Sequence, residues 1–383
     1  MLKDSALAVL QVAKIAKKYN YNMKDCHGFN VLIENNKPKF IDLGSFHENS
    51  EGVTGWEPYR EFLRFYYYPL CMWRDGFEYT SKLSIFSANL TPHTEHYIYK
   101  YRYLKNLNNN FLEKSIKARF SFSDIACKSS DMIYSKTRGK NFIFRNVIRY
   151  LKYFIDSSKI TLSQNLDWLE KDVQKINRKE INSQWKNYHS KISKKKSRFE
   201  YIIKYVNEYC YDARTAIDVA GNQGLFSLKI LKESSIEKVI CQDLDEQAID
   251  LGYKAHRNSN EYISYVNYNF IAPIVKTTHP LPSERFKSDV VFALALLHHL
   301  ILSQGFSLDD ILGELDKYSN KYVCIEFMPK GLWVHEDGDK VNVPSWYNLD
   351  WFREKFLRYF YILKEEQIAE NYVVFLGEKK GSQ

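Results

Sequence analysis

Two acidic residues and two glycines stand where a nucleoside-binding fold requires them. The stretch 216–226 reads AIDVAGNQGLF, which predicts an apolar strand, Asp218, a turn containing Gly221 and Gly224, and the start of a helix. A strand that breaks at glycines into a helix brings backbone N–H groups close to a ligand, at a helix end that favours negative charge. A second acid, Asp243, ends the next expected strand, at the distance that suits a ribose diol.

The glycine spacing indicates which nucleoside is bound. Dinucleotide sites use G-x-G-x-x-G, whereas this turn reads D-V-A-G-N-Q-G, with an acid before it and only two glycines. It resembles motif I of the class I S-adenosylmethionine (SAM) methyltransferases. A nucleotide site of another kind, or a relic of one, is the alternative. The resemblance implies SAM as the cofactor and a set of binding residues: Asp218, Ala220, Gly221, Asn222, Gly224, Asp243, Leu244, Asn269 and Ala295.

The elements that would position these residues alternate between strand and helix. A helix is expected over 198–211, followed by strands at 215–219, 238–242, 263–267, 289–294 and 321–326. Helices are expected at 225–233, 246–256, 295–303, 308–318 and 348–358, and a closing strand pair at 359–364 and 371–376. Such alternation predicts a parallel sheet covered by helices, with ligands at the carboxyl ends of its strands. The resemblance implies a Rossmann-like seven-stranded sheet whose last strand is antiparallel.

Three further residues come after strands of this expected sheet. Asn269, after the third strand, occupies the place where an acid or amide reads the adenine amino group, although an ordinary turn asparagine would look the same. His298 and His299 come after the fourth strand, beside the expected methyl donor. Neighbouring helical residues point about 100° apart, so only one of the two can face the cleft. Either is a candidate base for an acceptor hydroxyl, and core packing of both is the alternative.

A second constellation lies near the start of the chain. Asp25 and Asn30 precede a hairpin expected at 31–33 and 40–41, which leads to Asp42 in a D-L-G sequence. This segment resembles the catalytic segment of kinase-like folds, in which Asn30 and Asp42 would bind Mg²⁺ and Asp25 would be the base. Only 24 residues precede Asp25, and none form a glycine-rich loop, so a partner would have to supply the missing lobe. A scaffold without catalysis, a remnant metal or ligand site, and chance all remain open.

The remaining N-terminal sequence predicts a mainly helical region. Helices are expected at 5–19 and 162–185, and another begins near Gly55–Pro58 and ends at Pro69. Shorter helical patterns occur at 111–118 and 142–155. His93 and His96 form a lone pair without further metal-ligand spacing, so we expect no metal there. The domain boundaries expected are 1–165 for the kinase-like region, 166–197 for a connecting segment, and 198–380 for the methyltransferase domain.

Composition bounds the rest. The chain has 383 residues, of which 45% are hydrophobic and 26% charged, and no apolar run reaches the length of a membrane helix. The six cysteines show no C-x-x-C pair, and the start of the chain does not resemble a signal peptide, so we expect a cytoplasmic protein. The net charge of +9 permits an anionic partner, but abundant Lys, Asn, Ile, Tyr and Phe are also what AT-rich coding produces, so nucleic acid is not the expected partner.

The insert after the fifth expected strand indicates the class of acceptor. It begins beyond Glu326 and contains Trp333, Trp346 and Tyr347 among acidic residues, which suits a polar, hydroxylated acceptor, although a lid anchored by tryptophans would look the same. The chain has neither the [DNS]-P-P-[YF] motif used to methylate base amino groups in DNA nor a Pro-Cys nucleophile. These features favour transfer to oxygen.

Taken together, the segments resemble bacterial class I methyltransferases of the nodulation host-specificity type, which carry a kinase-like N-terminal region. The matching segments lie at both ends of the chain, and 75–160 matches poorly; they are LKDSALAVLQ, DCHGFNVLI, FIDLGSF, GWEPYREF, WKNY, IDVAGNQGLFS, CQDLDEQAI, ALALLHHL and IEFMPK. The resemblance implies O-methylation of a carbohydrate or glycolipid precursor. Asn269 replaces the acid that is usual in the group. An RNA or ribosomal methyltransferase and a non-catalytic SAM-binding protein are the rival functions.

Overall fold

The structure is a computed structural model of the chain, and it describes residues 1–49, 55–86, 166–178, 196–273, 280–333 and 343–381. Contacts divide the chain into two compact units. The first comprises Met1–Ile33 and Pro38–Glu180, and the second comprises Glu34–Lys37 and Ile181–Gln383. The domain boundaries expected at 165 and 197 stay predictions.

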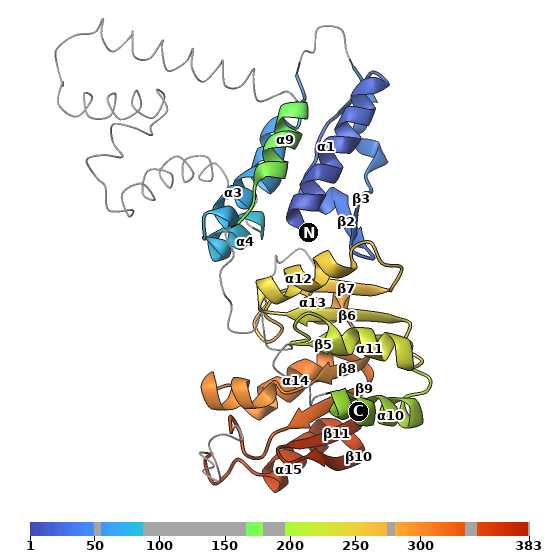
Figure 1. Cartoon of the computed structure of the whole chain (residues 1–383), viewed down its shortest axis with the longest axis vertical. Coiled ribbons are helices and arrows are strands. Elements are labelled where there is room, and N and C mark those ends of the chain that lie inside the picture. Colours follow the sequence, from blue (N-terminus) through green and yellow to red (C-terminus); the bar gives the residue numbers. More distant parts are fainter. Residues whose placement is uncertain (50–54, 87–165, 179–195, 274–279, 334–342, 382–383) are drawn as a thin grey trace, which may run out of the picture. The chain divides into compact units, whose positions relative to one another are not determined.

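The first unit combines helices with two small antiparallel sheets (Figure 1). Strand β1 (Tyr21–Met23) pairs with β4 (Phe46–Glu48), and β2 (Val31–Glu34) pairs with β3 (Lys37–Phe40). Short 3₁₀ turns at Gly28–Asn30 and Leu43–Ser45 flank the hairpin. The helices are α1 (Leu2–Lys18), α2 (Tyr59–Phe62), η3 (Leu63–Tyr67), α3 (Tyr68–Arg74), α4 (Glu78–Phe86) and α9 (Leu166–Lys175).

The core of this unit joins segments that are far apart in sequence. Leu10 of α1, Phe62 of α2 and Leu169 of α9 are fully buried in one apolar cluster. Lys14 of α1 also forms an ion pair with Glu170 of α9, at 2.7 Å. The expected helix over 162–185 therefore exists as α9, which ends at Lys175 and packs on α1.

The prediction that Pro69 ends a helix is wrong. The helix continues through it, because a π-turn at Leu63–Tyr67 precedes α3 and places Pro69 in the first turn of that helix. Proline lacks an N–H, and the first turn of a helix is where that group has no partner within the helix. The π-turn restarts the hydrogen-bond pattern at the proline, which sequence periodicity does not reveal.

The second unit is built on one seven-stranded sheet with the order β10-β11-β9-β8-β5-β6-β7. The bounds are β5 (Thr215–Val219), β6 (Lys238–Asp243), β7 (Ile263–Asn267), β8 (Ser288–Ala293), β9 (Ser319–Phe327), β10 (Phe360–Ala369) and β11 (Tyr372–Lys379). Strands β7, β6, β5, β8 and β9 pair in parallel, while β11 is antiparallel to both of its neighbours. The predicted seven-stranded sheet with an antiparallel last strand is confirmed, and this is the class I methyltransferase fold.

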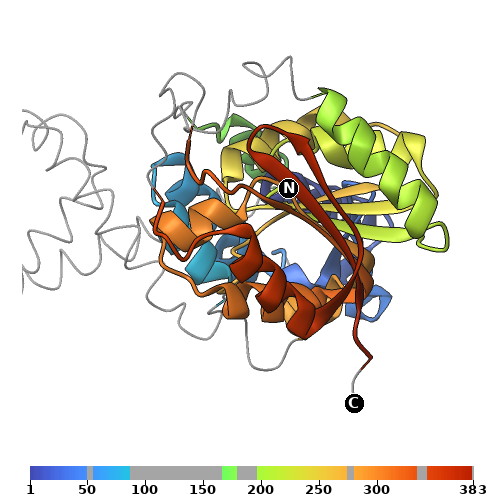
Figure 2. The ribbon, with the colours of Figure 1, turned by 90° about the horizontal axis from the view of Figure 1, so that it is seen from below.

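Helices cover both faces of the sheet, as Figure 2 shows. On one face, α10 (Lys196–Tyr209) and α11 (Leu225–Glu233) bury Val206 and Ile230 against the strands. The other face packs on α14 (Leu308–Tyr318) and α15 (Leu349–Tyr359), where Leu312 and Phe356 are fully buried. Helix α12 (Glu246–His256) packs on β6 and β7, and the short α13 (Pro282–Arg285) contacts α14. Burial on both faces explains the nearly continuous apolar strands.

Most elements of this unit begin and end within two residues of the predicted positions, and the exceptions are the segment after β8 and the closing strands. The helix expected over 295–303 cannot begin at Ala295, because that residue is in the left-handed region (φ 51°). The helical residues begin at Leu297 and continue as a π-turn, η6, at His299–Ser303. The closing strands are also longer than expected, since β10 and β11 pair over most of their length.

Several predictions fall outside the described residues. They are His93 and His96, the helical patterns at 111–118 and 142–155, the WKNY segment, and the acidic residues of the insert within 334–342. Within the ranges that are described, no helix has both the length and the apolar character needed to cross a membrane.

Candidate functional site

The loops at the carboxyl edge of the sheet contain unusual backbone. After β5 the chain passes through Ala220 (φ 59°) and Asn222 (φ 55°), both in the left-handed region, before Gly224 (φ 80°) caps α11. The third strained residue of this edge is Ala295, after β8. Left-handed backbone costs about 1–3 kcal/mol for a residue with a side chain, and such strain concentrates at functional sites. The strained backbone of the turn predicted from the D-V-A-G-N-Q-G sequence therefore indicates a functional role for this loop.

Asp218 lies directly beneath this turn. Its carboxylate is 2% exposed and accepts a hydrogen bond from the Ser227 hydroxyl at 2.6 Å. A Cβ atom at Gly221 would lie 2.7 Å from Asp218 Oδ2 and 2.8 Å from Cys241 Sγ, so only glycine allows the turn to close over the carboxylate. Burial, together with the charges of Asp243 and Glu326, raises the pKa of Asp218 to about 7. This geometry makes Asp218 a support for the turn.

Asp243 ends β6 beside the same turn and holds it with its side chain. One carboxylate oxygen accepts the Asn222 N–H at 2.8 Å, and the other accepts the Asp245 N–H at 2.7 Å. Burial raises its pKa to about 6, against the lowering effect of these backbone hydrogen bonds. Each oxygen of a carboxylate has two lone pairs, so both can accept one more hydrogen bond from a ligand hydroxyl.

Gln242 is a residue of this edge that sequence analysis missed. Its side chain is 1% exposed; Oε1 accepts the Ala220 N–H at 3.3 Å, and Nε2 donates to the carbonyl of Tyr268. Gln242 therefore connects the turn after β5 with the loop after β7. A polar residue inside an otherwise apolar strand, directly before Asp243, was the available indication.

The other predicted cofactor residues occupy the same edge in different ways. Leu244 comes directly after Asp243 and is 60% exposed, an apolar side chain open to a ligand. Asn269 is half-buried, and its side-chain oxygen accepts the Ile271 N–H at 3.2 Å, which is the turn role considered as the alternative. Adenine contact by Asn269 stays a prediction, as do the ligand contacts of the remaining set.

The two histidines after β8 lie against one another. Their ring centroids are 4.1 Å apart, with His298 5% exposed and His299 partly exposed. Burial lowers the pKa of His299 from its ordinary value near 6.5, so its imidazole is neutral at pH 7 and able to accept a proton. Both stand at the π-turn η6, and π-turns are frequent at functional sites. Which histidine acts as a base stays a prediction.

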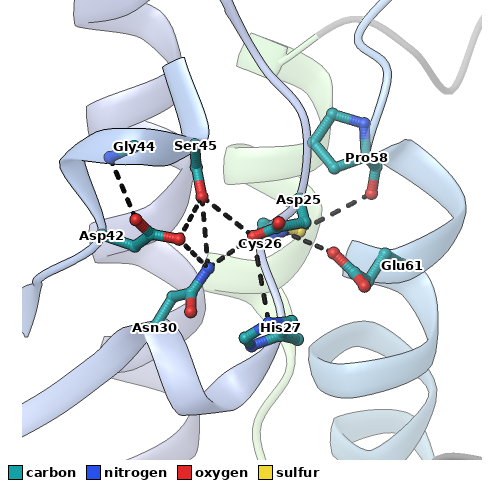
Figure 3. A network of polar contacts seen from close by, with 9 residues as sticks. All are labelled: Asp25, Cys26, His27, Asn30, Asp42, Gly44, Ser45, Pro58 and Glu61. Atoms are coloured by element: carbon teal, nitrogen blue, oxygen red, sulfur yellow. Dashed lines mark hydrogen bonds and ion pairs between the residues drawn. The ribbon is translucent and has the colours of Figure 1, made fainter.

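The residues predicted near the start of the chain form a closed network (Figure 3). Asn30 Nδ2 lies 2.5 Å from Asp25 Oδ1 and 3.4 Å from Asp42 Oδ2. The Ser45 hydroxyl lies 2.5 Å from Asp42 Oδ2 and 3.0 Å from Asp25 Oδ1, and the Gly44 N–H donates to Asp42 Oδ1. The structure thus brings Asp25, Asn30 and Asp42 together, and Ser45 was missed by sequence analysis.

This network holds its two carboxylates with donors rather than leaving them open. The Asn30 side chain is 6% exposed, and its amide nitrogen, not its oxygen, faces both acids. Among the residues that the structure describes, no group of three or more His, Cys, Asp or Glu side chains could hold a metal ion. Mg²⁺ binding by Asn30 and Asp42 stays a prediction, as does the kinase-like character of this unit.

The turn after β5, Asp243 and the start of α11 together can bind a nucleoside with a charged tail. The first N–H groups of α11 have no partner within the helix, and its N-terminus favours negative charge. Asp243 supplies acceptors for a diol, and Leu244 supplies an apolar surface beside it. The two histidines follow β8, which is the neighbour of β5 in the sheet, so they lie at the same carboxyl edge.

Comparison with known proteins agrees with the resemblance inferred from the sequence. The chain is 25% identical over 357 residues to the nodulation protein NoeA of Rhizobium meliloti (strain 1021), a match covering 86% of this chain and 67% of that protein. No family model matches the chain.

Solved structures that resemble the chain cover about half of it. The PH0226 protein of Pyrococcus horikoshii OT3 is 16% identical, with a TM-score of 0.39, over 52% of this chain and 94% of its own. The magnesium protoporphyrin IX methyltransferase ChlM of Synechocystis PCC 6803, solved with bound SAM, is 10% identical, with a TM-score of 0.37, over 53% of this chain and 87% of its own.

Proposed function

We propose that this protein is a SAM-dependent methyltransferase that methylates a hydroxyl group of a carbohydrate or glycolipid precursor. The observation that carries the proposal is the carboxyl edge of a class I methyltransferase sheet, where the strained turn 218–224 and Asp243 meet. The nodulation host-specificity type that the sequence resembles supports the glycan class of acceptor by analogy.

The residues present fit this cofactor. Gly221 and Gly224 let the turn close against the protein, since Cβ atoms there would lie 2.7 Å from Asp218 Oδ2 and from Tyr265 Oη, respectively, and backbone without side chains lets a ligand approach closely. In the proposal, Asp243 accepts the ribose hydroxyls and Leu244 packs on the adenine. When bound, SAM supplies a methyl group activated by its sulfonium. The protein's part is to align this group with the acceptor oxygen, and such positioning can lower a barrier by roughly 7–11 kcal/mol.

The segment after β9 supports a hydroxylated acceptor. Trp346 is 48% exposed and packs edge-on against Trp351, with ring centroids 5.0 Å apart. In the same region Lys330 Nζ lies 4.3 Å from the centre of the Trp333 ring and pairs with Glu370. An exposed indole such as Trp346 near charged groups suits sugar rings, which present apolar C–H faces and polar rims.

His299 is the proposed proton acceptor. With the methyl group that SAM would supply, the imidazole would take the proton that the acceptor hydroxyl loses on methylation. We expect His299→Ala to slow transfer about tenfold to hundredfold at pH 7.5, with the SAM dissociation constant unchanged. Because burial lowers the pKa of His299, the acid limb of the wild-type rate measured at saturating SAM should lie below pH 6.5 and should vanish in the variant. A limb that persists in His299→Ala would exclude His299 as the base.

The experiment that tests the function is transfer of labelled methyl from SAM into fractionated extract of the host cell. We expect label in the glycan or glycolipid fraction, lost in Asp218→Ala, because removing the carboxylate leaves the turn after β5 without the group on which it rests. Label in RNA would overturn the glycan proposal in favour of an RNA methyltransferase. A purified protein that binds no SAM would overturn the methyltransferase proposal itself.

A further inference from the structure

Tyr265 of β7 is buried between two glycines of other elements. Its side chain is 2% exposed. A Cβ atom at Gly224, the N-cap of α11, would lie 2.7 Å from its hydroxyl oxygen, and one at Gly252 of α12 would lie 2.3 Å from ring atom Cε1. Real Cβ atoms do not approach other atoms so closely, so the ring occupies its position only because both residues are glycine. The two glycines therefore allow a tyrosine ring to pack beside the turn after β5.

The hydroxyl of Tyr265 holds that turn directly. It donates to the backbone carbonyl of Gln223 at 3.1 Å, and Gln223 stands between Asn222 and Gly224. The Asn222 N–H is held on the Asp243 carboxylate at 2.8 Å. Two side chains from two different strands therefore fix the backbone of the turn: Asp243 accepts the Asn222 N–H, and Tyr265 donates to the Gln223 C=O.

His256 also contacts the Tyr265 hydroxyl and determines which group that hydroxyl donates to. Its Nδ1 lies 3.0 Å from the Gly252 carbonyl and 3.0 Å from the Tyr265 hydroxyl oxygen, and the two rings are nearly parallel. A carbonyl can only accept, so Nδ1 must carry a hydrogen, which also faces the hydroxyl oxygen. The Tyr265 proton is then directed to Gln223. Burial raises the pKa of the Tyr265 hydroxyl, so this donor keeps its proton at neutral pH.

We infer that Tyr265 is a positioning residue for the cofactor loop: its hydroxyl fixes the Gln223 carbonyl and so preforms the turn that would receive SAM. The inference rests on the proposed function. A loop already held in its bound conformation loses less entropy when the ligand binds, so the hydroxyl contributes to affinity without touching the ligand. Tyr265 is therefore distinct from the predicted cofactor contacts, which lie on the turn itself.

The test compares two Tyr→Phe variants by calorimetric titration with SAM. Tyr265→Phe keeps the ring between the glycines and removes only the hydroxyl. Tyr322→Phe is the matched control, because Tyr322 is also a buried strand tyrosine (4% exposed) whose hydroxyl donates, here to Asp212 at 2.9 Å, near the amino end of β9. We expect the SAM dissociation constant to rise about fivefold to tenfold in Tyr265→Phe and to stay at the wild-type value in Tyr322→Phe.

Urea unfolding without SAM separates positioning from general stability. Tyr265→Phe loses the hydrogen bond to Gln223 and the contact with His256, whereas Tyr322→Phe loses the hydrogen bond to Asp212. We expect both variants to lose stability and only Tyr265→Phe to lose SAM affinity. Wild-type affinity in Tyr265→Phe, or an equal loss in both variants, would overturn the positioning role while leaving the proposed function intact. A wild-type protein that does not bind SAM would overturn the proposed function and, with it, this inference.

Discussion

Asp243→Ala should raise the SAM dissociation constant about 100-fold. In the proposed complex the carboxylate accepts two ribose hydroxyls, and each hydrogen bond to a charged group contributes about 1.5–3 kcal/mol, so the loss is about 3 kcal/mol or more. The variant also releases the Asn222 N–H, which the carboxylate now holds at 2.8 Å. Isothermal titration at pH 8 measures the change, because the pKa of about 6 leaves the carboxyl ionised there.

Asp289→Ala is the control for this experiment. Its carboxylate also accepts two backbone N–H groups, from Arg214 at 2.9 Å and Thr215 at 3.0 Å, but at the start of β8, on the opposite edge of the sheet. We expect the Asp289→Ala variant to bind SAM with wild-type affinity. In the wild type, affinity should fall as the pH drops through about 6, because a protonated Asp243 loses acceptor strength. Unchanged SAM affinity in Asp243→Ala would refute the ribose assignment.

Asp218→Asn should remove a large pH dependence of stability. The pKa of this carboxyl is about 7 in the folded protein, because of burial, against an ordinary value of 3.8. Between these values the folded state binds the proton more tightly than the unfolded state, so stability falls as the pH rises. The loss is complete above pH 7 and amounts to at most about 4 kcal/mol. Asparagine stays neutral and can still accept from the Ser227 hydroxyl.

Urea unfolding of the wild type and Asp218→Asn from pH 4 to pH 8 measures this effect. We expect the variant's advantage in free energy of unfolding to grow from pH 4 to pH 7 and to become constant above it. Taking the difference between the two proteins cancels the titration of other groups. A difference that stays constant with pH would show that Asp218 has an ordinary pKa in the folded state and that its burial is offset by other interactions.

The sequence located the second unit accurately because its signals are local. Strands 215–219 and 263–267 and helices 225–233, 246–256 and 308–318 have the bounds predicted for them. Each strand is an apolar run ended by polar or glycine residues, and each helix carries an apolar stripe. The left-handed backbone at Ala220 and Ala295 was not predicted, since alanine gives no sign of it. The π-turns at 63–67 and 299–303 were not predicted either, because the apolar periodicity of a sequence does not distinguish them from an α-helix.

By itself the sequence determined that the second unit has an α/β sheet and that acids and glycines lie at its carboxyl edge. It also determined that a hairpin separates Asp25 and Asn30 from Asp42. Only the tertiary structure decided what these residues contact. In the tertiary structure Gln242 connects two loops, and the Ser227 hydroxyl donates to Asp218. Tyr265 lies between Gly224 and Gly252. The physical reason is that a propensity acts over a few neighbouring residues, whereas these contacts join elements brought together by strand order. Tyr265 and Gln223 are 42 residues apart, and no local pattern records that they meet.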